Sequence, residues 1–135
     1  MKVVDEIVSA VAAEGDAAVR RYSGRLDGWN PESFRLSTVE IQAALGRVPA
    51  QVLDDMAFSQ DQVRKFAAAQ RATMKDLEVE TLPGVRLGHR HIPIASVGAY
   101  VPGGRYPMVA SAHMSIVTAK VAGVERVAAC TPPRT

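Results

Sequence analysis

The first half of the chain alternates hydrophobic and polar residues with the spacing of α-helices. Apolar residues recur three and four positions apart over residues 3–11 and again over residues 19–26, which is the pattern of a helix with one buried face. Gly15 separates the two stretches, and the side chain of Asp16 is suited to cap the second one. The sequence therefore predicts a pair of short helices at its start.

Two more helices are predicted before this pattern changes. A short extended piece over residues 34–36 leads to Ser37 and Glu40, whose spacing matches a capping box and opens a helix to about Leu45. Pro49 is placed in the first turn of a long helix, where its missing N–H costs nothing. The predicted inner face of that long helix consists of Val52, Met56, Val63, Phe66, Ala67 and Gln70.

From Leu77 the period shortens to the alternation of β-strands. Residues 77–81 and 85–90 place apolar side chains at every second position, on either side of a Pro83-Gly84 turn. Two alternating stretches joined by a tight turn are typical of a β-hairpin. The hairpin therefore marks the end of the helical part of the chain.

The last third of the chain reads as strand, loop, helix, strand. Residues 95–101 form a nearly unbroken apolar run, typical of a strand covered on both faces. A helix of small and apolar residues near 109–122 and a buried strand over 126–130 complete one parallel crossover unit. The predicted class is α/β, with a helical region over 1–73 and the start of an α/β domain over 74–135.

Composition and charge narrow the function classes. The 135 residues are 47% hydrophobic and 22% charged with a net charge of +2, and no basic tract suggests a nucleic-acid partner. Cys130 is the single cysteine, so no intrachain disulfide is possible. No signal peptide is recognised and no apolar run approaches ~20 residues, so we expect no membrane span and a cytoplasmic location.

A candidate ligand loop, Tyr100-Val-Pro-Gly-Gly104, follows the first strand of the crossover unit. Ligands of open α/β sheets bind at this end of the strands. Pro102 fixes its φ, Gly103 and Gly104 allow close backbone approach to an anion, and Tyr100 could lie against a base or nicotinamide. Arg105 could hold a phosphate, carboxylate or sulfonate. The alternative is a plain turn with a core tyrosine and a solvated arginine.

Five other side chains carry weaker signals. His89 and His91 share one face of a strand, which suits either an exposed sheet edge or a metal, although no third ligand lies nearby in the sequence. His113 falls early in the helix after the loop and could face a substrate or be packed. Cys130 is expected to be a buried structural thiol. Trp29 is either an anchor against another surface or a cover for its own helices.

The loop and its surroundings closely resemble the histidinol dehydrogenase family. The residues that carry the resemblance are the run Ser96–Gly104, Pro107, residues 118–124 and the Cys130-Thr-Pro-Pro133 segment, with Gly15–Val19 and Leu26–Gly28 upstream. Residues 104–115 and 29–37 look more like the branch that oxidises sulfopropanediol. The resemblance covers nearly the whole chain, and the glycine loop is its most specific part.

The resemblance implies the N-terminal portion of an NAD-dependent, zinc-containing dehydrogenase. Such enzymes oxidise a primary alcohol, of the histidinol or sulfopropanediol type, through an aldehyde to a carboxylate, and work as homodimers. The implied fold is a helical arm plus a hairpin leading into an incomplete Rossmann-like parallel sheet. The family's motif tyrosine, which contacts NAD, falls on Tyr100, and Pro102, Gly103 and Gly104 complete the cofactor loop, while Arg105 and His113 are the candidate substrate contacts.

No catalytic residue and no metal ligand is assigned in this chain. The family's zinc ligands and its catalytic Glu–His pair lie downstream of these residues, so we expect no catalysis from this portion alone. We also expect it to be marginally stable or prone to association, because a two-stranded sheet leaves an edge unpaired. Two alternatives stay open: a non-catalytic truncated interaction module, and an anion-binding module built on Gly103, Gly104 and Arg105.

Overall fold

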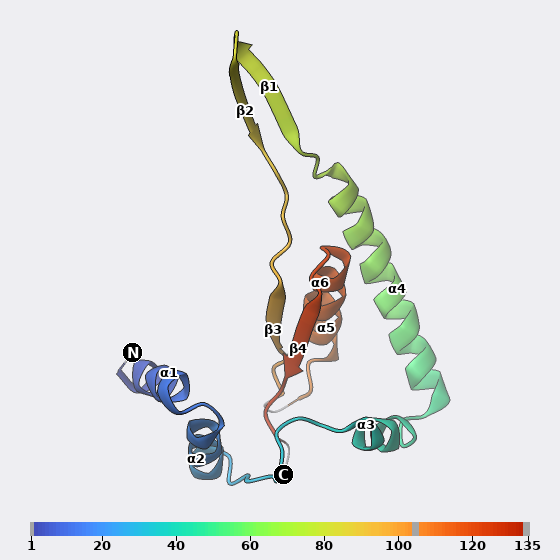
Figure 1. The fold of residues 1–135 in the computed structure, drawn as a ribbon. Coiled ribbons are helices and arrows are strands. Elements are labelled where there is room, and N and C mark those ends of the chain that lie inside the picture. The colour runs from blue at the N-terminus through green and yellow to red at the C-terminus, as the bar shows by residue number, and fades with distance from the viewer. Residues whose placement is uncertain (1, 104–105, 134–135) are drawn as a thin grey trace. The chain divides into compact units, whose positions relative to one another are not determined.

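The computed structural model describes residues 2–103 and 106–133 (Figure 1). Its helices and strands are α1 (Lys2–Glu14), α2 (Asp16–Leu26), α3 (Thr38–Leu45), α4 (Ala50–Thr73), β1 (Leu77–Leu82), β2 (Val85–His89), β3 (Ser96–Tyr100), α5 (Val109–Ala112), the π-helical segment η1 (His113–Val117), α6 (Thr118–Val121) and β4 (Arg126–Cys130). They form two compact units, one built mainly from residues up to Arg47 and the other from Val48–Thr131. The predicted mixture of helices, hairpin and parallel strands is confirmed.

None of the helices in the described part of the chain is both long enough and apolar enough to cross a bilayer. The predicted division into residues 1–73 and 74–135 concerns domains that fold independently, and it stays a prediction. Within the second unit, α4 packs against η1 and α6 (Figure 1).

Helices α1 and α2 pack against each other in the first unit. The N-cap of α2 is Gly15, at φ +59°, and no side chain caps the helix. Asp16 is instead the first residue of α2, so its predicted capping role is wrong, because the glycine makes the reversal between the helices. The Arg21 guanidinium donates to both carboxylate oxygens of Glu14, at 2.6 and 2.9 Å, and these hydrogen bonds lower the pKa of the Glu14 carboxyl.

Phe34 and Arg35 form bends and Leu36 is irregular, so the predicted extended piece is not found. Arg20 contacts this segment: it donates to Asn30 Oδ1 at 3.1 Å and to the Pro31 carbonyl, and lies 5.2 Å over the Phe34 ring. Trp29 is half-buried and meets Phe34 edge-on, with ring centroids 5.6 Å apart. Trp29 therefore packs within its own loop.

The capping box that opens α3 is confirmed. The Glu40 N–H donates to the Ser37 hydroxyl at 3.2 Å, and the Ser37 N–H donates to the Glu40 carboxylate at 2.7 Å. These reciprocal bonds satisfy two amides that a helix start leaves without an intrahelical partner.

Helix α4 exists as predicted, and Pro49 stands one residue before it, at the N-cap. Its buried face is narrower than the predicted one. Ala67 is buried, whereas Phe66 is 67% exposed. The predicted inner position of Phe66 is wrong for this chain, because the partners that α4 finds in the second unit are the short segments η1 and α6.

The predicted hairpin is confirmed as the antiparallel pair β1–β2. Gly84, at φ +81°, makes the turn that a residue with a Cβ adopts only with strain. Val79 faces Leu87 across the strands, while Glu78 and Arg86 form an ion pair of 2.9 Å. The hairpin is amphipathic, and all of its strand residues are exposed in this chain.

Strands β3 and β4 pair in parallel, in register from Ser96 with Arg126 to Tyr100 with Cys130. The strand residues are mostly exposed and Ala99 alone in β3 is buried, so the expected cover on both faces is not found among the described residues. The helix between the strands is helical throughout as predicted, but residues 113–117 form a π-helical segment. Gly123, at φ +93°, follows its last turn and leads into β4.

Candidate functional site

The candidate site lies where the two parallel strands end. Tyr100 is the last residue of β3 and Cys130 the last of β4, and the two are register partners. One further backbone bond ties the strands beyond this pair, because the Val101 N–H donates to the Cys130 carbonyl at 2.8 Å. This places the start of the candidate loop at the carboxyl edge of the parallel pair, the edge at which ligands of α/β sheets bind.

The described part of the loop leaves the Tyr100 ring open to solvent. Tyr100 is 62% exposed, whereas Pro102 and Gly103 are half-buried. The Met108 N–H donates to the Pro102 carbonyl at 3.1 Å and closes the loop one residue before α5 begins. An exposed aromatic ring above a closed backbone turn can stack on a planar ligand. Two predicted site residues, Gly104 and Arg105, lie outside the described residues.

His113 is buried at 8% exposure and begins η1. Two backward side-chain bonds accompany the π segment, since the Ser115 hydroxyl donates to the Ser111 carbonyl at 2.7 Å and the Thr118 hydroxyl donates to the Met114 carbonyl. Single π turns inside helices occur often at functional sites. A packed histidine at this position is compatible with either reading of the sequence, and its substrate contact stays a prediction.

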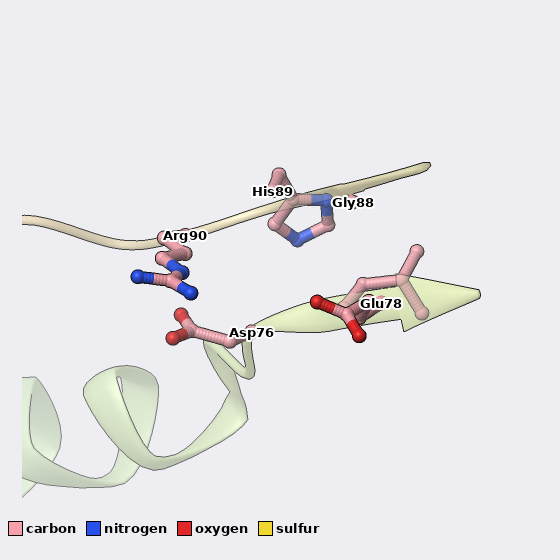
Figure 2. A pocket seen from close by; sticks show the side chains of 6 residues that line it. Asp76, Glu78, Gly88, His89 and Arg90 are labelled. Carbon is pink, nitrogen blue, oxygen red and sulfur yellow. The ribbon is translucent and has the colours of Figure 1, made fainter. Parts of the chain in front are cut away.

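Polar side chains gather in a shallow hollow at the base of the hairpin, lined by Asp76, Leu77, Glu78, Gly88, His89 and Arg90 (Figure 2). The His91 N–H donates to Asp76 Oδ1 at 2.9 Å, and the rings of His89 and His91 meet edge-on. Figure 2 shows the Asp76 carboxylate and the Arg90 guanidinium pointing toward one another. These contacts organise the strand ends of the hairpin.

The described residues do not fit a zinc site. Residues 2–103 and 106–133 contain no group of three or more His, Cys, Asp or Glu side chains placed to hold a metal ion. A structural or catalytic zinc needs at least three such ligands. No step of a reaction can therefore be assigned to zinc on the side chains described here.

Cys130 is exposed, and its predicted burial is wrong for this chain. The prediction rested on the apolar residues that precede Cys130. In the described chain β4 pairs with β3 alone, and most of its residues are exposed. Sequence reasoning also missed that Cys130 lies beside Tyr100. The predicted parallel crossover brings the carboxyl ends of these strands to one edge, but the register that pairs Tyr100 with Cys130 is seen only in the structure.

Two parallel strands joined by a helix, with an exposed aromatic residue at their carboxyl edge, form part of an α/β domain. The family model for histidinol dehydrogenase matches residues 1–135. The chain belongs to the histidinol dehydrogenase family.

Curated relatives and a solved structure match almost the whole chain. A histidinol dehydrogenase homolog of Shouchella clausii is 57% identical, and sulfopropanediol 3-dehydrogenase of Ruegeria pomeroyi is 44% identical, each over 98% of this chain. The crystal structure of histidinol dehydrogenase from Elizabethkingia anophelis matches 98% of the chain with a TM-score of 0.86 at 28% identity. The chain spans about 30% of the length of these proteins: 31%, 30% and 30%, respectively.

Proposed function

We propose that this chain contributes some of the residues that line the cofactor site of an NAD- and zinc-dependent dehydrogenase. The reaction is the oxidation of a primary alcohol through an aldehyde to a carboxylate, and bound NAD would accept the hydride at each of the two oxidations. The observation that carries the proposal is the exposed Tyr100 ring at the carboxyl edge of β3 and β4. Pro102, Gly103 and Gly104 complete the cofactor loop.

In this proposal, residues of this chain bind and orient the dinucleotide and contact the substrate. The Tyr100 ring packs against a planar ring of the dinucleotide, and the loop backbone lies beside its phosphates. Arg105 and His113 are the proposed substrate contacts. Zinc and the groups that transfer protons come from the rest of the enzyme, which works as a homodimer in the cytoplasm.

The proposed substrate is a small alcohol of the histidinol or sulfopropanediol type. Identity of 44% to sulfopropanediol 3-dehydrogenase supports the sulfonated diol, as do the segments 29–37 and 104–115. Steady-state rates of the complete enzyme with the two alcohols decide between them. A kcat/KM higher for histidinol than for sulfopropanediol would contradict the sulfonated diol.

Replacing Tyr100 with alanine in the complete enzyme tests the cofactor role. Loss of one ring stack of about 1–3 kcal/mol raises the Kd for NAD by roughly 5- to 160-fold, measured by calorimetry. Tyr100→Phe is the matched control, because it keeps the exposed ring and should change the Kd less than about twofold. An unchanged Kd in Tyr100→Ala would overturn the assigned role.

A second candidate, a non-catalytic interaction module, is favoured by the apolar side chains that α1 and the hairpin leave exposed, such as Val4, Val8 and Leu87. The test is co-expression of this 135-residue chain with a full-length relative. Co-purification of the pair together with absence of NAD binding to the chain supports the module.

A further inference from the structure

The strand ends bring a second side chain to the Tyr100 ring. Tyr100 and Cys130 are register partners in a parallel pair, and such strands lie about 4.8 Å apart. Because side chains alternate between the two faces along each strand, register partners point to the same face. Both side chains are exposed in this chain. The Cys130 side chain therefore lies on the same face of the sheet as the Tyr100 ring, one strand away.

The backbone holds this arrangement in place. The bond from the Val101 N–H to the Cys130 carbonyl, 2.8 Å long, extends the ladder past the last register pair. Cys130 can separate from Tyr100 only if this bond breaks. The two side chains thus move as one surface at the carboxyl edge of β3 and β4.

We propose that Cys130 lines the cofactor site together with Tyr100, with its thiol against the edge of the planar ring that stacks on the tyrosine. This inference rests on the proposed NAD site. Stacked rings prefer an offset arrangement with centroids 4.5–7 Å apart. A ring offset from Tyr100 toward β4 covers the position of the Cys130 side chain. The ligand is the nicotinamide or the adenine of the dinucleotide, since both present a flat face and a polar edge.

Protection of the native thiol tests the inference without a substitution. The complete enzyme is treated with iodoacetamide, with and without NAD at ten times its Kd, and alkylation of the Cys130 peptide is followed by mass spectrometry. Occupancy at that concentration slows the reaction roughly tenfold if bound NAD covers the thiol. Nicotinamide mononucleotide and ADP-ribose, tested separately, identify the half of the cofactor that covers it.

The matched control is a cysteine introduced as Ala128→Cys in a Cys130→Ser background. Ala128 lies two residues earlier on β4, so its side chain is on the same face but farther from the strand end. We expect less protection of this thiol than of Cys130. Equal protection at both positions overturns the inference, because it indicates a general change of the fold on binding.

The outcomes separate the inference from the proposed function. If calorimetry detects no NAD binding to the wild-type enzyme, both the proposed cofactor site and the inference about Cys130 are wrong. If NAD binds and the alkylation rate of Cys130 is unchanged, the inference alone is wrong. A thiol that does not react even without NAD also overturns it, because a covered side chain cannot line the site.

Discussion

Ser37 and Glu40 illustrate how much a single pair of residues determines locally. Their two reciprocal hydrogen bonds, at 3.2 and 2.7 Å, define the first residue of α3. The bonds from the Ser37 side chain and backbone also lower the pKa of the Glu40 carboxyl, because they favour its charged form. An ionised Glu40 therefore favours the start of α3.

Ser37→Ala removes the hydroxyl from the capping box. We expect α3 to lose about 1 kcal/mol of stability, as for other serine caps, and to exchange its first amide hydrogens faster. The measurement is hydrogen exchange of residues 38–45. Ser37→Thr keeps the hydroxyl and should retain most of the protection. Equal exchange in Ser37→Ala and the wild type would contradict the prediction.

The depressed pKa of Glu40 sets the direction of a pH effect. A carboxyl whose folded pKa is lower than its unfolded pKa stabilises the helix at pH values above the unfolded pKa. That stabilisation is lost as the pH falls through the folded pKa. An NMR titration of the Glu40 carboxyl measures the effect. In Ser37→Ala, which lacks the hydroxyl, the pKa of Glu40 should move upward toward its ordinary value.

Residues with local partners were predictable, and residues with distant partners were not. The capping box needs positions three apart, so the sequence alone located it. The exposure of Cys130 and its place beside Tyr100 depend on the pairing of two strands about 30 residues apart, which no local pattern encodes. The part of the site that stayed hidden is therefore the part made by strand pairing.

In the hairpin, too, features set by local sequence were predictable, and features set by contact with the neighbouring strand were not. Its two alternating strands and its Pro83-Gly84 turn were read correctly from the sequence. The place of Gly88 was not: a Cβ built on this residue would overlap the backbone carbonyl of Leu77 on the neighbouring strand. Strand β2 thus approaches β1 more closely at Gly88 than an alanine allows.

Gly88→Ala should weaken the hairpin by about 1–3 kcal/mol, because backbone atoms of β1 must shift to admit the methyl group. Gly98→Ala is the matched control, since Gly98 lies in β3 with nothing within 4 Å of its added Cβ. Amide exchange of β1 and β2 measures the effect. Equal protection of these strands in both variants would contradict the close approach.

Helix residues 109–122 were predicted as one continuous helix, and the π segment within it was not predicted. Composition does not distinguish the two helix types here, because small and apolar residues predominate in both. The backward bonds of Ser115 and Thr118 become evident only in the folded chain. Packing against α4, which is remote in sequence, accompanies this local change.

At the scale of the molecule, the buried part of the described chain is small. The buried side chains are Ala18, Tyr22, Ala67, Ala99, His113, Val117 and Val124, and none of the described large side chains is fully enclosed. Many apolar residues remain exposed, among them Leu87 and Met114. Exposed apolar surface of this kind drives association.

The 135-residue chain, expressed alone, should therefore melt over a broad range that shifts with its concentration. It should also bind a hydrophobic dye such as ANS. Thermal melts at several concentrations, with sedimentation at each, measure both effects. A sharp transition that does not change with concentration, together with no dye binding, would contradict the prediction.

Because of the π segment, the number of residues in the helix after the candidate loop affects how that loop is oriented. Each residue of an α-helix adds about 100° of rotation and 1.5 Å of rise. The extra residue carried by residues 113–117 therefore turns α5 relative to α6, and α5 holds the end of the loop that begins at Tyr100. Deleting one residue there would re-aim the loop without changing any of its side chains. Residue count within this helix, as well as residue identity in the loop, should therefore influence the direction in which the loop after Tyr100 leaves β3.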